Sequence, residues 1–288
     1  MLHVITYARV MKKQNTPTLL ALGIITGLSL STSAQAVILF ADNFDRADNN
    51  DLNASATGKS GSLGALNWEE RSSGGVANIE SNRLQIGEAG GGGGGWAIAY
   101  PDHNFTDASI SSTGSFTVSL DLIGPIGSGG GTRFTGFAVG NSLAEVNGWS
   151  SNNPTTTFTS DFFFGYDTTG TNEVKVFKNG TTQDYQQSIN LDAGATLSAT
   201  FSGITDFNSG STVNYEVFIN GGSVNTGSFI WSGTNDNYIA VYSNYTTNGT
   251  PVDNFSISDP SVVTAIPEPS STALLGLAGI TLLIRRRK

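Results

Sequence analysis

The side chains whose spacing could do chemistry are carboxylates. They lie near both ends of residues 37–260, the long central part of the chain, which is called the body below. Asp42, Asp45 and Asp48 recur at every third position, and Asp253 stands near the far end. Proteins bind Ca²⁺ through carboxylate and carbonyl oxygens. If the first and last strands of the body pair, we expect Asp42, Asp45 and Asp253 to meet and hold Ca²⁺. The alternative is that these residues cap turns and keep strand edges soluble.

Tryptophan side chains offer a second chemistry, the stacking of sugar rings. Trp149 lies in a polar, loop-like segment, residues 147–153, and is therefore the best exposed candidate. Trp68, beside the acidic pair Glu69 and Glu70, is a second candidate. The competing interpretation is structural, because most aromatic side chains of a β-sandwich pack in its core.

Catalytic groups are scarce in this sequence. The chain has no Cys, and His103 is the one histidine of the body, so His/Cys zinc sites and a Ser-His-Asp triad lack their residues. A glycosidase needs two carboxylates roughly 5 to 10 Å apart. Glu69 and Glu70 are neighbours, and neighbours on a strand point to opposite faces. We assign no catalytic residue.

The charge of the body is strongly negative. Between residues 37 and 264, seven Lys and Arg stand against twenty-two Asp and Glu, a formal charge of −15. Such a surface repels nucleic acids and anionic lipids, so we exclude nucleic acid as a partner. The charge is typical of a protein kept soluble outside the cell.

The elements that must position these residues are predicted to be strands. Alternation dominates the body, with no window of helical periodicity, and each apolar run is short and bounded by Gly, Asn, Asp or Ser. Residues 115–122 show the pattern best, since Phe116, Val118, Leu120 and Leu122 fall on one face. The remaining expected strands are 38–40, 84–86, 96–100, 133–139, 161–166, 173–178, 195–202, 213–219, 238–243 and 255–258.

Two hairpins and the two ends of the body indicate how the strands are arranged. Residues 174–180 and 215–221 each run into Asn-Gly, the residue pair that best tolerates the positive φ of a tight hairpin turn. The body opens with Asp-Asn-Phe at 42–44 and closes with Asp-Asn-Phe at 253–255. Together these features resemble the concanavalin A-like, laminin-G-type jelly roll. The resemblance implies an all-β fold, a single antiparallel jelly-roll sandwich over 37–260, in which the first and last strands lie together.

The last residues of the chain combine three features. Pro267-Glu268-Pro269 is followed by the uncharged, apolar run 270–284 and then by Arg285, Arg286, Arg287 and Lys288. As a helix the run would be roughly 22 Å long, short for a hydrocarbon core of about 30 Å. We expect a short C-terminal transmembrane helix, with its basic end on the cytoplasmic side.

This order of features resembles the PEP-CTERM sorting signal of exopolysaccharide-producing Gram-negative bacteria. The resemblance covers residues 261–288 and implies that a membrane-embedded exosortase recognises Pro267, Glu268 and Pro269 and removes the tail. The inner membrane would then hold the chain transiently. The alternative is an ordinary C-terminal membrane anchor.

The start of the chain is predicted to be a secretory signal peptide, residues 1–36. Lys12 and Lys13 precede an apolar stretch, and Ala34-Gln35-Ala36 provides the small residues at which signal peptidase would cut, after Ala36. Met11 is a more natural start than Met1. Both ends therefore predict export through the inner membrane to the cell surface or beyond.

Three functions remain open from the sequence. The leading hypothesis is an exported, non-enzymatic surface or matrix protein associated with extracellular polysaccharide or biofilm. The first alternative is a calcium-stabilised carbohydrate-binding module, and the second is an extracellular glycan-active enzyme.

Overall fold

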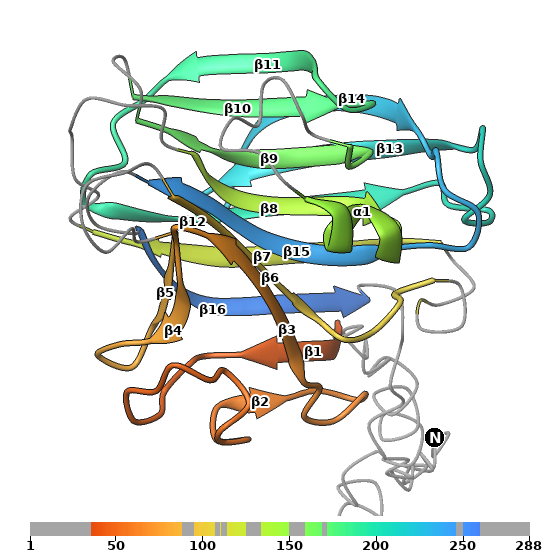
Figure 1. The fold of residues 1–288 in the computed structure, drawn as a ribbon. Coiled ribbons are helices and arrows are strands. Elements are labelled where there is room, and N and C mark those ends of the chain that lie inside the picture. Colours follow the sequence, from red (N-terminus) through yellow and green to blue (C-terminus); the bar gives the residue numbers. More distant parts are fainter. Residues whose placement is uncertain are drawn as a thin grey trace, which may run out of the picture. The chain divides into compact units, whose positions relative to one another are not determined.

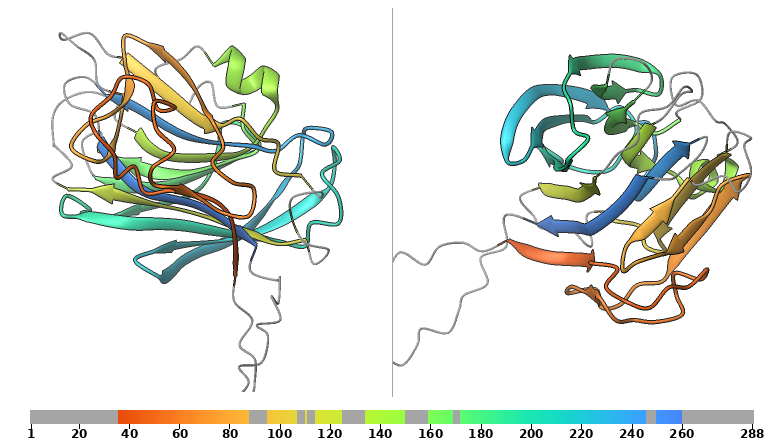
Figure 2. Two further views of the ribbon diagram at one scale, coloured as in Figure 1. Left: turned by 90° about the horizontal axis from the view of Figure 1, so that it is seen from below. Right: turned by 90° about the vertical axis from the view of Figure 1, so that its left-hand side faces the viewer.

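A computed structural model describes residues 36–87, 95–106, 110, 114–124, 134–149, 159–168, 172–245 and 250–259. Residues 34–264 form one compact unit. Within it, two antiparallel β-sheets lie face to face, and the views in Figures 1 and 2 separate the two layers. The all-β sandwich predicted from the sequence is confirmed.

One layer is a nine-stranded sheet. Its main path, in spatial order, is β14 (Gly222–Ile230), β13 (Thr212–Ile219), β12 (Gly194–Ser202), β7 (Phe116–Ile123), β16 (Thr250–Asp259), β1 (Val37–Asp42) and β2 (Lys59–Ser60). Two short strands extend it beside β16, namely β5 (Leu84–Ile86) and β4 (Ala77–Ile79).

The other layer is a seven-stranded sheet. Its spatial order is β11 (Thr182–Ser188), β10 (Glu173–Lys178), β9 (Phe162–Asp167), β8 (Phe134–Asn141), β15 (Tyr238–Tyr245), β6 (Gly95–Pro101) and β3 (Trp68–Ser73). The chain crosses between the layers repeatedly, for example at β7–β8, β11–β12 and β15–β16, which is the connectivity of a jelly roll rather than of two separate meanders.

Both predicted Asn-Gly hairpins are present. The turn between β10 and β11 has φ of 48° at Asn179 and 82° at Gly180, and the turn between β13 and β14 has 50° at Asn220 and 76° at Gly221. Two consecutive positive φ values give the backbone twist that matches antiparallel strands. The two hairpins lie in different layers, so the sequence similarity between them marks equivalent turns of one sandwich.

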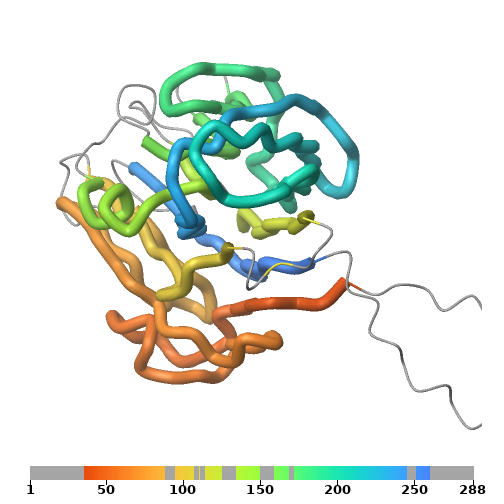
Figure 3. Tube along the Cα trace, turned by 90° about the vertical axis from the view of Figure 1, so that its right-hand side faces the viewer, coloured from red at the N-terminus to blue at the C-terminus, as the bar shows by residue number. Residues whose placement is uncertain are grey.

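The first and last strands of the body are neighbours, as predicted. Strand β1 pairs with β16 from Val37–Asp259 to Asp42–Phe255. Figure 3 shows this pair as a red-orange segment beside a blue one. The pairing brings the two Asp-Asn-Phe segments of the sequence to the same part of the nine-stranded sheet.

The main core fills the space between the layers. Strand β7 contributes alternate residues, with Phe116, Val118 and Leu120 fully buried, as its sequence pattern predicts. Phe162 of β9 meets Phe201 of β12 edge to face across the interior, with ring centroids 4.9 Å apart. Aromatic rings therefore supply much of the contact between the two sheets.

A second apolar cluster lies on the outer face of the seven-stranded sheet. It includes Trp96, Phe134, Trp149, Phe163 and Tyr242. Helix α1 (Leu143–Gly148), the one helix among the described residues, packs on this face through its buried Val146. The sequence shows no helical periodicity in the body and predicted no helix there, so α1 is a correction.

Several sequence predictions fall outside the described residues. These are the signal peptide up to residue 35, the sorting motif at 267–269, the apolar helix 270–284 and the basic residues 285–288. Where the structure does describe the chain, no helix has the length and apolar character that a membrane crossing requires.

Candidate functional site

A surface hollow beside Trp149 is the site that combines aromatic and charged side chains. Its volume is about 460 Å³, and it is called the Trp149 hollow below. Strand β3 supplies four lining residues from Glu70 to Ser73, β6 supplies Trp96, and Trp149 follows α1 directly. The Arg71 and Ser73 side chains leave β3 on the same face of the sheet as Trp96, whereas those of Glu70 and Ser72 leave on the opposite face.

Helix α1 places Trp149 at this position because its start is fixed by a capping box. The Ser142 hydroxyl accepts from the Glu145 N–H at 3.2 Å, and the Ser142 N–H donates to the Glu145 carboxylate at 2.7 Å. These bonds satisfy two of the N–H groups that a helix start leaves without partners. The sequence carries the signal as Ser-Leu-Ala-Glu at 142–145, although its turn of helix is too short to show periodicity.

The end of α1 is held by residues from two strands. The Arg71 Nε donates to the Asn147 side-chain oxygen at 3.1 Å, and its Nη1 donates to the Asn147 main-chain oxygen. The Tyr100 hydroxyl donates to the same Asn147 side chain at 2.9 Å. Arg71 therefore both lines the hollow and fixes the helix that carries Trp149.

Glu70 borders the hollow, but its carboxylate lies on the inner side of β3. Partial burial raises the pKa of the Glu70 carboxyl, and the Leu52 N–H, which donates to its Oε1 at 3.0 Å, acts against that shift. Glu69, the next residue, is exposed, and the two side chains leave β3 on opposite faces. The structure thus does not join them into one pair of carboxylates.

Trp149 is less accessible than the sequence suggested. Only 8% of the residue is exposed, because its ring packs on Tyr242 of β15 at a centroid distance of 5.1 Å. The prediction of an exposed sugar platform is therefore wrong in that respect. Trp149 can present an edge to the hollow, and a ligand there would depend chiefly on the polar groups of β3.

Trp68, the second predicted sugar contact, belongs to the core. It is 1% exposed and packs edge to face on Phe40 and Phe255. Its Nε1 donates to the Asp42 Oδ2 at 2.8 Å. Trp68 is thus enclosed by the core and offers no exposed face to a sugar ring.

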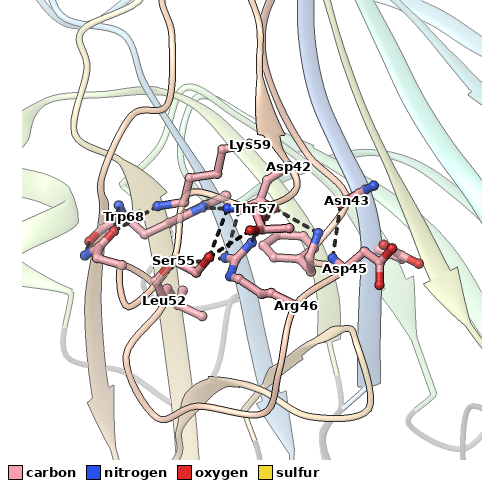
Figure 4. A network of polar contacts seen from close by, with 12 residues as sticks. Asp42, Asn43, Asp45, Arg46, Leu52, Ser55, Thr57, Lys59 and Trp68 are labelled. Atoms are coloured by element: carbon pink, nitrogen blue, oxygen red, sulfur yellow. Dashed lines mark hydrogen bonds and ion pairs between the residues drawn. The ribbon is translucent and has the colours of Figure 1, made fainter.

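Asp42 forms a buried ion pair rather than an open metal ligand, as the close view in Figure 4 shows. Its carboxylate accepts from Arg46 at 2.7 and 3.0 Å and from the Phe44 N–H at 2.8 Å. Arg46 also donates to the main-chain oxygens of Thr57 and Leu52, both at 3.1 Å. This network ties the long connection after β1 to its own start and leaves Asp42 engaged on both oxygens.

The other two predicted calcium ligands lie elsewhere on the surface. Asp45 is exposed, and Asp253 is half-buried opposite Asp121 in the β16–β7 pair. Burial raises the pKa of Asp253, and the charges of Asp121 and Asp45 add to the shift. Among the described residues, no group of three or more His, Asp or Glu side chains is arranged to hold a metal ion.

A second hollow, of about 380 Å³, surrounds an acid that the sequence analysis did not single out. Asp161 lies at the start of β9, is 1% exposed, and shares the hollow with Glu145 and Ser232. Burial raises the pKa of Asp161 to about 6, against a hydrogen bond at 2.9 Å from the Ser232 N–H to its Oδ2. The charge of Glu145 on α1 raises it further. No sequence motif marks this position, since its burial arises from packing.

His103 is half-buried, and its ring packs edge to face on Phe105 at 4.8 Å. Desolvation lowers the pKa of its imidazole, opposed by the charge of Asp102.

Comparisons with known proteins assign the tail and describe the body. Residues 265–288 match the PEP-CTERM protein-sorting motif, as the sequence analysis inferred, and this motif indicates an exported protein. No curated protein matches the chain.

Solved structures similar to the body include legume lectins and a legume lectin-like domain. Lectin II from Ulex europaeus is 10% identical, with 67% of this chain and 92% of that chain covered and a TM-score of 0.39. The legume lectin-like domain from Entamoeba histolytica is 12% identical over 66% and 87%, with a TM-score of 0.39. The Bauhinia forficata lectin in complex with GalNAc is 14% identical over 66% and 90%, with a TM-score of 0.42.

Proposed function

We propose that this chain is an exported, non-enzymatic surface protein of a Gram-negative bacterium, delivered by its tail and associated outside the cell with exopolysaccharide. The observation that carries the proposal is the sorting motif at 265–288 behind a strongly acidic β-sandwich. Signal peptidase and an exosortase are its expected partners during export, and the inner membrane holds the chain only transiently.

The sorting step is tested by changing the motif in the producing bacterium. With Pro267, Glu268 and Pro269 replaced by Ala, we expect the chain to remain in the inner-membrane fraction with its tail uncut. A matched change of Ser270, Ser271 and Thr272 to Ala keeps the motif and should leave surface delivery intact. Equal amounts of the two variants and the wild type at the surface would overturn this part of the proposal.

A carbohydrate-binding function is the second candidate, and the Trp149 hollow is the observation that favours it. The hollow is open to solvent, and the side chains of Arg71 and Ser73 lie on the same face of the sheet as the edges of Trp96 and Trp149. Such polar groups can pair with sugar hydroxyls, while the indole edges exclude water from one side. The chemistry fits a neutral or weakly acidic sugar unit.

Binding is tested with exopolysaccharide from the producing strain, immobilised as a surface. We expect Ser73→Ala to weaken binding of residues 34–264 by on the order of tenfold, the effect of about 1.4 kcal/mol from one lost polar contact. Ser62→Ala, at an exposed residue outside the hollow, is the matched control. Binding unchanged by Ser73→Ala, in a variant with the wild-type melting temperature, would remove the hollow as the site.

A further inference from the structure

Strand β14 is an outer edge of the nine-stranded sheet. Among the described strands it pairs only with β13, and its register is continuous over six residues, from Asn225 opposite Val217 to Ile230 opposite Thr212. A β-bulge at Val224 separates this run from the turn. An open edge of this kind presents unpaired N–H and C=O groups to any approaching strand.

The hydrogen bonds around β14 show which of its residues face outward. The Trp231 N–H donates to the Ser211 oxygen of the β13 side at 2.8 Å, whereas the Ile230 N–H donates away from β13, to the Asn179 side chain at 2.9 Å. In an antiparallel strand the direction alternates from residue to residue. The outward N–H and C=O groups are therefore those of Thr226 and Ser228, and Asn179 covers the N–H of Ile230.

The other outer edges are protected in ways that β14 is not. Strand β3 carries Glu69, Glu70 and Arg71, and β2 is two residues long. Strand β11 carries Asp184, which a bulge leaves out of register. Charges, bulges and short strands are the devices by which proteins block edge-to-edge pairing. Between Asn225 and Ile230, β14 contains no charged residue, no proline and no bulge.

The charge of the body limits which surfaces of two copies can approach each other. A second copy also carries a charge of −15 over residues 37–264, so most surfaces of two copies repel each other. Two β14 edges can meet without like charges facing each other, because residues 225–230 carry no charge. The edge is self-complementary about a twofold axis through Gly227. This axis places Thr226 of each copy opposite Ser228 of the other copy, which makes two equivalent pairs. Hydroxyl side chains in such cross-strand positions can pair as well.

We propose that β14 is a self-association edge at which two copies of this chain join antiparallel, extending their nine-stranded sheets into one. Two facing pairs of outward residues supply four main-chain hydrogen bonds, since each such pair exchanges two. The contact is small, so the dimer is weak in solution, and crowding of copies at a surface would raise its occupancy. The inference does not depend on sugar binding.

Sedimentation velocity on residues 34–264, the compact unit that holds every strand of both sheets, tests the proposal. The wild type should move from monomer toward dimer as its concentration rises from about 10 µM to about 1 mM, the range of a weak, small interface. Hydrogen exchange followed by NMR should slow with concentration at the Thr226 and Ser228 amides, and not at Gly227, whose N–H faces β13.

A charged pair of substitutions separates this edge from general association. Thr226→Lys with Ser228→Lys sets like charges opposite each other on the solvent face, and we expect the association constant to fall at least about tenfold. Thr182→Lys with Ser188→Lys makes the same charge change on β11 and should leave it unchanged. The proposal would be overturned if the wild type stayed monomeric over the whole concentration range, or if the amides that gain protection lay away from β14. An equal fall of the association constant in both double variants would overturn it too.

Discussion

Replacing Asp161 with Asn should stabilise the body at neutral pH, although it removes a hydrogen-bonded charge. Asp161 is 1% exposed, and burial raises its pKa from 3.8 to about 6. A folded-state pKa above the unfolded value means that the folded protein binds the proton more tightly. The stabilisation is therefore complete below about pH 3.8 and is lost as pH rises through about 6.

The size of the effect follows from the shift. About two pKa units correspond to roughly 3 kcal/mol, at 1.36 kcal/mol per unit, as an upper limit at pH 7.5. The amide introduced by Asp161→Asn would keep an oxygen for the Ser232 N–H and would carry no charge to desolvate. We expect a gain of about 1 to 3 kcal/mol, because the new amide N–H groups also need acceptors. For a body of this size that raises Tm by about 2 to 12 °C, at about 2 to 4 °C per kcal/mol.

Calorimetry of residues 34–264 at pH 7.5 and pH 4 provides the measurement. The two proteins should differ at pH 7.5 and converge at pH 4, where Asp161 is itself neutral. Asp206→Asn is the control of opposite sign, because a hydrogen bond from the Ser211 hydroxyl lowers the pKa of Asp206. A difference between Asp161→Asn and the wild type that does not change with pH would refute the reasoning.

Three further predictions concern the same fragment. Asp42→Asn leaves the buried Arg46 charge without its counter-ion and should lower the unfolding free energy by about 3 to 5 kcal/mol in urea titrations, and a loss below about 1 kcal/mol would contradict that role. Asn220→Ala should be about 1 kcal/mol less stable than Asn220→Gly, because φ is 50° there, and equal stability of the two would show that the turn is not strained. EDTA should leave Tm unchanged because Asp42 is already paired, and a fall in Tm that Ca²⁺ reverses would restore the calcium hypothesis for Asp253.

The sandwich could be predicted because its signals are local. Alternation in β7 and positive-φ turn residues at Asn179 and Asn220 depend on neighbours in the chain, and the structure confirms both. Strand β14 was missed because its Gly-, Ser- and Asn-rich sequence has little apolar alternation, and pairing with β13 makes it a strand. Helix α1 was missed because one turn is too short to show a period.

Charge, the absence of cysteine, the strand pattern and the sorting tail were all determined by the sequence itself, since each depends on residue type and local order. The roles of individual side chains were decided by tertiary structure. Trp149 and Trp68 both look available in the sequence, yet Tyr242 covers one and the core encloses the other. Asp42 became an ion-pair partner and Asp161 a buried acid because burial, which residues distant in the chain create, sets the cost of a charge.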